Sequence, residues 1–80
     1  MTCYHVKYMA VLHEPLRLRR LHIGVYGSLG QARVAIAFLS EKPGFRAHPH
    51  AFYIYRTFPL RRPAELNRTH LITGFDPAAL

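Results

Sequence analysis

Side chains alternate with a period of two along residues 2–12, near the start of the chain. Successive residues of a β-strand point to opposite faces of a sheet, so this alternation predicts a strand. One face would carry Tyr4, Val6, Tyr8, Ala10 and Leu12, and the other Cys3, His5, Lys7, Met9 and Val11. We expect Tyr4, Val6 and Tyr8 to lie under a helix. Four residues of later strands would join them there: Ile23, Val25, Phe52 and Ile54.

The segment HEPLRLRR, residues 13–20, breaks the alternation at Pro15 and is rich in arginine, so we predict a polar hairpin loop there. Alternation resumes over residues 21–26 and predicts a second strand. Leu21, Ile23 and Val25 fall on one side of it. Antiparallel pairing of the two strands is the simplest topology, because sequential strands usually lie side by side.

A helix is predicted to begin after Ser28, because Ser28 and Gln31 have the spacing of a capping box. Apolar residues then recur at i, i+3, i+4 and i+7, which predicts a stripe that faces the core. The stripe consists of Ala32, Ala35, Ile36 and Leu39. We expect the helix to stop at Pro43-Gly44, since proline lacks an amide donor and glycine tolerates a positive φ.

Residues 51–58 alternate again and predict a third strand. Because this strand follows the second through a helix, a right-handed crossover would make the two parallel neighbours. Residues 59–80 are less regular, with a helical turn expected near 64–67 and a short strand at 70–75. The expected fold class is α+β: one domain over residues 1–80, a small β-β-α-β sheet with one helix packed on one face, and a short fourth strand at the C-terminus.

The charge balance points to binding rather than to a particular reaction. The chain has eleven Lys and Arg residues and four Asp and Glu residues, which gives a formal net charge of +7. Such a charge favours nucleic acid, an anionic membrane or an acidic protein as a partner. An arginine-rich composition is also typical of proteins from high-GC genomes, so charge alone indicates association and not function.

The chain carries no sign of a membrane or secreted location. No run approaches the roughly 20 apolar residues of a membrane-spanning helix. The first residues lack the basic leader and long apolar stretch of a signal peptide. The single cysteine, Cys3, excludes an internal disulfide framework. We therefore expect a cytoplasmic protein with no membrane partner.

Catalytic and metal-binding patterns are weak. His48 and His50 are two imidazoles one residue apart, but a zinc site needs three or four convergent ligands, so we expect no metal and no cofactor. Cys3 and His5 would share a strand face, and such a pair can activate a thiol. The four acids are scattered and form no carboxylate pair. We expect no enzyme, and a reaction at Cys3 and His5 is the least favoured hypothesis.

Part of the chain resembles a family of small bacterial domains of unknown function. The family pattern is G-x-Y-S-S, an Ala-rich helix, P-G-F, P-x-G-F-x-I and a late G-F. The matching positions are Gly24, Tyr26, Ser28, Pro43, Gly44, Phe45, Pro49, Phe52, Ile54, Gly74 and Phe75. This chain departs from the pattern at Gly27, Ala51 and Leu71. The resemblance implies a shape and carries no activity.

One face of the predicted sheet suits single-stranded nucleic acid. The strand side away from the helix would present His5, Lys7, His22, Tyr26, Tyr53 and Tyr55. Aromatic rings among cations on an open sheet are a surface on which unpaired bases stack. The candidate residues are Lys7, His22, Tyr53, Tyr55, Arg17, Arg19, Arg20, Arg61 and Arg62. The alternative is that tyrosines simply favour strands and cover a second packing surface.

The far side of the predicted helix suggests a protein contact. Val34, Ala37 and Phe38 lie opposite the core-facing stripe and would form an apolar patch. A second copy of the chain or a larger protein can cover this patch, and so can the tail of the same chain through Leu66, Leu71, Ile72 and Phe75. Our leading hypothesis is a non-enzymatic protein-binding or accessory module, as a homodimer or beside a larger protein. Single-stranded nucleic-acid binding is the alternative.

Overall fold

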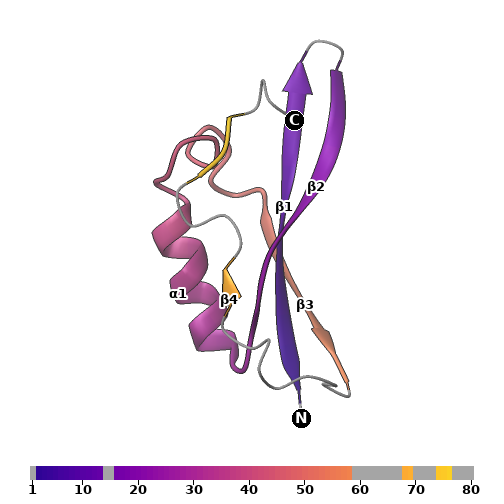
Figure 1. Ribbon diagram of the computed structural model, residues 1–80, viewed down its shortest axis with the longest axis vertical. Coiled ribbons are helices and arrows are strands. Elements are labelled where there is room, and N and C mark those ends of the chain that lie inside the picture. The colour runs from indigo at the N-terminus through magenta and orange to yellow at the C-terminus, as the bar shows by residue number, and fades with distance from the viewer. Residues whose placement is uncertain (1, 14–15, 59–67, 70–73, 77–80) are drawn as a thin grey trace.

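A single helix covers one face of a small twisted sheet in the computed structural model, which describes residues 2–13, 16–58, 68–69 and 74–76 (Figure 1). The strands lie in the order β3-β1-β2-β4. Their bounds are β1 Cys3–His13, β2 Leu16–Tyr26, β3 Phe52–Thr57 and β4 Arg68–Thr69, with helix α1 at Leu29–Leu39 between β2 and β3. The predicted α+β fold is confirmed. Within the described residues, no helix has the length and apolar character needed to cross a membrane.

Helix α1 begins at the predicted cap. The Gln31 amide donates to the Ser28 Oγ atom at 3.2 Å, and the Ser28 hydroxyl donates to Gln31 Oε1 at 3.3 Å. The helix ends at Leu39, earlier than the predicted stop at Pro43-Gly44. Ser40 explains the difference, because its hydroxyl donates to the Ala37 carbonyl at 2.9 Å and competes with continued helix. Tight turns then run from residue 40 to residue 50.

The core lies between α1 and the sheet. Of the predicted stripe on α1, Ala32 and Leu39 are fully buried and Ala35 and Ile36 are packed against the buried cluster. An aromatic group closes the end of the core beyond the helix. The ring of Tyr8 lies 4.8 Å from those of Phe45 and Phe52 and 5.6 Å from that of Phe75, centroid to centroid, in edge-to-face geometry.

Two glycines let the turn after α1 meet the late segment of the chain. Gly44 and Gly74 have φ of 86° and 94°, which favours glycine, and the Phe75 amide donates to the Pro43 carbonyl at 2.9 Å. A Cβ atom on Gly44 would lie 2.8 Å from the Phe75 ring. The positive φ expected at Gly44 is therefore confirmed, and the close approach gives a second reason for glycine.

The position predicted for the fourth strand, near the C-terminus, was wrong. The fourth strand is β4 at Arg68–Thr69, which pairs antiparallel with Val25 and Gly24 of β2. Residues 74–76 are not in a strand, although the sequence predicted one at 70–75. The helical turn predicted near 64–67 and residues 70–73 lie outside the described residues.

The first hairpin is longer than predicted. Residues 16–20 belong to β2 and not to a loop, because β1 runs to His13 and pairs with β2 in register up to Leu16. The segment L-R-L-R itself alternates, so it satisfies the strand pattern after Pro15. Residues 16–20 of β2 are all exposed, whereas Ala10 and Leu12 of the paired part of β1 are buried.

The strand order also corrects a prediction. β3 does not lie beside β2; it pairs antiparallel with β1, from Cys3 opposite Thr57 to Tyr8 opposite Phe52. β3 still runs parallel to β2, because both are antiparallel to β1. The crossover through α1 therefore skips one strand. This arrangement gives β1 a partner on each side, and it buries Val6 and Tyr8 almost completely.

A β-bulge reverses the expected faces at the end of β2. Val6 lies opposite Gly24 but Lys7 lies opposite His22, so Ile23 is the extra residue. Beyond the bulge, Tyr26 pairs with Tyr4 on the helix side and is 5% exposed. Val25 pairs with His5 on the opposite side. The predictions that Tyr26 lies on the open face and Val25 under the helix are therefore wrong.

Candidate functional sites on two faces

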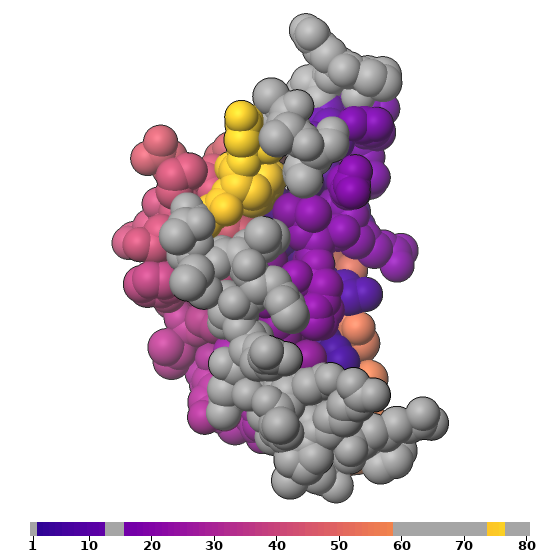
Figure 2. Space-filling model, in the orientation of Figure 1, coloured from indigo at the N-terminus to yellow at the C-terminus, as the bar shows by residue number. Residues whose placement is uncertain are grey.

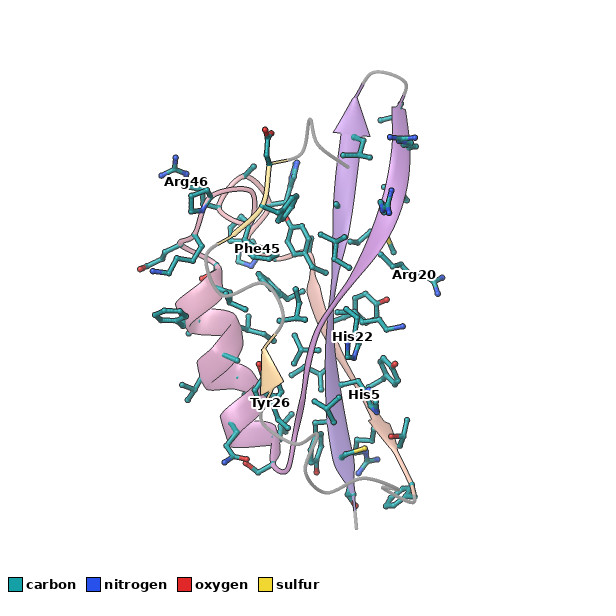
Figure 3. The ribbon with its side chains drawn as sticks, in the orientation of Figure 1. His5, Arg20, His22, Tyr26, Phe45 and Arg46 are labelled. Carbon is teal, nitrogen blue, oxygen red and sulfur yellow. The ribbon has the colours of Figure 1, made fainter. Side chains whose placement is uncertain are left out.

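The open face is the side of the sheet that points away from α1. Residues paired directly across an antiparallel sheet share a face, so Lys7 lies in one row with His22 of β2 and Tyr53 of β3. In the next row His5 lies opposite Tyr55. Figure 3 shows His5, His22 and Arg20 on this side and Tyr26 on the side of α1. Four predicted residues, Lys7, His22, Tyr53 and Tyr55, are thus brought together.

Ring contacts organise the open face. The Tyr55 ring stacks on the His5 ring with centroids 4.8 Å apart and planes 8° apart. Lys7 Nζ lies 5.2 Å from the centroid of the Tyr55 ring, within the range of a cation–π interaction. The His22 ring lies 5.8 Å from the His5 ring. His5 was not among the residues predicted to bind nucleic acid, and its ring contacts both Tyr55 and His22.

The environment of His5 favours its neutral form. Burial, followed by the positive charge of Lys7, lowers the pKa of His5 below its ordinary value of 6.5. His5 Nε2 lies 2.8 Å from the Thr57 hydroxyl, while its buried Nδ1 has no hydrogen-bond partner among the described residues. The ring is therefore held in place by Thr57 and by the Tyr55 stack.

The predicted arginines do not all reach this face. Arg20 pairs opposite Met9 and shares the open face with Lys7. Arg17 and Arg19 pair opposite Leu12 and Ala10, which lie on the helix side of the sheet. Arg61 and Arg62 lie outside the described residues. The sequences of β1, β2 and β3 contain no Asp or Glu, so the charge of the sheet is positive on both sides.

The end of the open face near the β1–β2 hairpin is apolar. Met9 and Val11 of β1 share it with Leu16 and Leu18, which are 74% and 66% exposed. The sequence prediction missed these leucines because it placed them in a polar loop. Their alternation with arginines was the available signal.

Cys3, His5 and Thr57 form a small cluster at the opposite end of β1. Cys3 Sγ lies 2.8 Å from the Thr57 hydroxyl and 3.4 Å from His5 Nε2. The prediction that Cys3 and His5 share a face is confirmed, and Thr57 is a third member that only strand pairing could identify. The thiol side chain is 1% exposed, so it contacts these neighbours rather than solvent. A reaction at this cluster stays the least favoured hypothesis.

His48 and His50 are exposed in the turns before β3. In the parts of the chain that the structure describes, no group of three or more His, Cys, Asp or Glu side chains is placed to hold a metal ion. The expectation that the protein takes no metal stays a prediction.

The α1 face is the second candidate site and is apolar. Val34 and Phe38 are 71% and 56% exposed, and Ala37 is exposed beside them. They border an open hollow of about 660 Å³, lined by Tyr26, Gly30, Gln31, Val34, Ala35 and Phe38. Lys42 Nζ lies 4.4 Å from the centroid of the Phe38 ring. In Figure 2, atoms of α1 and of the sheet reach opposite sides of the molecule.

The tail does not supply Phe75 to the α1 face, because the Phe75 ring packs against Tyr8 and Phe45 in the core. The other tail residues of that alternative, Leu66, Leu71 and Ile72, lie outside the described residues. The exposed side chains of Val34 and Phe38 therefore form an apolar surface next to the hollow.

The chain was also compared with known proteins. No family model matches it, and neither the curated proteins nor the solved structures contain a match. The resemblance to small bacterial domains of unknown function stays a prediction, and the function must be inferred from the two faces.

Proposed function

We propose that the protein is a small, non-enzymatic binding module that associates with a second copy of itself through the α1 face. The observation that carries this proposal is the exposure of Val34 and Phe38 beside the hollow. A domain of this size buries a limited share of its surface, so a dimer would remove apolar area that the monomer leaves in water. Two-fold dimers are the commonest oligomers.

The charges that flank the α1 face support a second copy as the occupant. Arg33 lies toward the start of the patch and Glu41 just beyond its end, and both are exposed. In an antiparallel pair of α1 helices related by a two-fold axis near Ala37, each Arg33 faces Glu41 of the other copy. The same arrangement places Phe38 beside Val34 of the other copy, with an offset of two residues, or about 3 Å, along the helix axis. The small side chain of Ala37 lets the two helices approach closely.

This proposal includes a cytoplasmic location, which the single cysteine supports, and no catalytic role. The net charge of +7 works against self-association, because two copies repel each other. Salt screens that repulsion but leaves apolar contacts in place. Dimerisation through α1 should therefore become stronger as salt is added.

Phe38→Asp tests the proposal directly. We expect wild-type protein to show the mass of two chains at high concentration, and the variant to show the mass of one chain, by sedimentation equilibrium. A charge next to Val34 of the other copy would lie in an apolar contact, which is unfavourable. Leu18→Asp is the matched control, because Leu18 is 66% exposed on the open face and should leave the mass unchanged.

The charge pair provides the second arm of this experiment. Arg33→Glu should weaken the dimer, and Arg33→Glu combined with Glu41→Arg should restore it. A single-chain mass for wild-type protein at every concentration and salt would contradict the proposal. So would equal effects of Phe38→Asp and Leu18→Asp on the mass.

A further inference from the structure

We infer that the open face of the sheet binds single-stranded nucleic acid, with Tyr53 and Tyr55 as stacking platforms and Lys7 and Arg20 as phosphate contacts. This inference is independent of self-association, because it uses the face of the sheet opposite α1. It depends on the convergence of rings and cations from three strands onto one surface.

The two tyrosines are spaced for successive bases. They are two residues apart on β3, so they share a face at a separation of about 6.8 Å along the strand. Tyr55 is 36% exposed and its ring is supported by the parallel His5 ring. A base that stacks on Tyr55 extends a column that already exists, so the protein loses little side-chain freedom on binding.

The cations lie where the phosphates of such a strand would pass. Lys7 Nζ lies over the Tyr55 ring, 5.2 Å from its centroid, and Lys7 occupies the row of Tyr53 and His22. Arg20 follows in the next row on the same face and is exposed. No acidic residue of β1, β2 or β3 opposes a phosphate at this surface.

A single strand fits these features better than a duplex or an acidic peptide. Stacking on Tyr53 and Tyr55 requires the flat face of a base, which is hidden between neighbours in a duplex. An acidic peptide would use the cations and leave the rings without a matching group. Single-stranded DNA and RNA share the required chemistry, so both belong in the test.

The experiment is a fluorescence-anisotropy titration of labelled single-stranded DNA, single-stranded RNA and duplex DNA. The oligonucleotides should be short enough to contact one copy of the protein. Tyr55→Ala and Tyr53→Ala should each weaken single-strand binding about 5- to 150-fold, the range expected for one stacked base. Tyr55→Phe keeps the ring and should bind like the wild type.

Cation variants separate the proposed site from general attraction. Lys7→Gln should weaken binding more than Arg17→Gln, because Arg17 lies on the other side of the sheet. Phe38→Asp should leave binding unchanged, which keeps this inference distinct from the dimer proposal. Each variant is first checked by thermal unfolding, and Tyr53→Ala serves if Tyr55→Ala does not fold.

Three results would overturn the inference. The first is duplex binding as tight as single-strand binding. The second is equal loss from Lys7→Gln and Arg17→Gln with no effect of either tyrosine, which would indicate nonspecific attraction. The third concerns polyglutamate as a competitor. If the same concentration of polyglutamate displaces the oligonucleotide from wild-type protein and from Tyr55→Ala, the rings take no part in binding.

Discussion

The open face and the α1 face each contain a pair made of a lysine and an aromatic ring, and yet the two faces differ in chemistry. On each face a lysine lies over an aromatic ring: Lys42 over Phe38 at 4.4 Å, and Lys7 over Tyr55 at 5.2 Å. The hollow beside Phe38 is mostly apolar, with Val34 and Ala35 in its lining. The Tyr55 ring stacks on His5, His22 lies next to His5, and strands β1, β2 and β3 contain no acidic residue. The surroundings of a pair, and not the pair itself, indicate what a surface binds.

The largest expected effect removes both faces together, because both rest on one core. Phe45 is fully buried against Tyr8, Phe52 and Phe75. Phe45→Ala should lower the free energy of unfolding by about 3–5 kcal/mol, as large-to-small core changes do. Urea denaturation measures this value. Phe58→Ala is the control, since Phe58 is 69% exposed and should change stability by less than about 0.5 kcal/mol.

Loss of one activity in Phe45→Ala with the other intact would show that the two faces do not depend on a shared core. Equal stability losses for Phe45→Ala and Phe58→Ala would contradict the packing described above.

Salt should separate the two faces, with an intermediate effect. Raising salt from about 50 to 200 mM should weaken single-strand binding about 7-fold if Lys7 and Arg20 each neutralise one phosphate. The same change should strengthen the dimer by screening repulsion between basic chains. Anisotropy and sedimentation equilibrium measure the two responses on one sample. Responses of the same sign would mean that one of the two faces has been assigned the wrong partner.

The smallest expected effect is the pH dependence contributed by His5. Burial and Lys7 lower the pKa of His5 in the folded protein, so below pH 6.5 the unfolded chain binds more protons than the folded one. The stabilising effect of neutral His5 is complete above pH 6.5 and is lost as the pH falls toward its lower folded pKa. The free energy of unfolding should therefore decrease over this range.

His5→Gln should flatten that decrease, which urea denaturation at several pH values can follow. His22, Lys7, Tyr55 and Cys3 face His5 and remain in the variant, so the difference between the two curves isolates His5. An unchanged pH dependence in His5→Gln would contradict the assignment of this effect to the open face.

Much of the local structure followed from the sequence. Alternation identified β1 and β3, and a 3.6-residue period identified the buried stripe of α1. Ser28 and Gln31 located the helix start, and Gly44 has the expected positive φ. These features are predictable because each depends on residues within a few positions of one another.

Part of the candidate sites also followed from alternation. The four residues on the predicted face are Lys7, His22, Tyr53 and Tyr55. His22 keeps its predicted side because it comes before the bulge at Ile23 along β2, and the pairing of β1 with β3 has no bulge. Val34 and Phe38 are exposed because they lie opposite the buried stripe. The contact between Cys3 and Thr57 was not predicted, and neither was the stack of His5 on Tyr55. Both contacts depend on which strand lies beside β1.

The sequence by itself determined the order β-β-α-β and most of the side of each element that faces the core, because periodicity reports local burial; it did not give the start of β2 or the position of β4. Only the tertiary structure decided that β3 pairs with β1, and that a bulge at Ile23 turns Tyr26 inward and Val25 outward. It also placed Arg20 on the open face and Arg17 and Arg19 on the other. Strand order and register depend on how distant segments pack together, and a shift of one residue exchanges the faces of a strand.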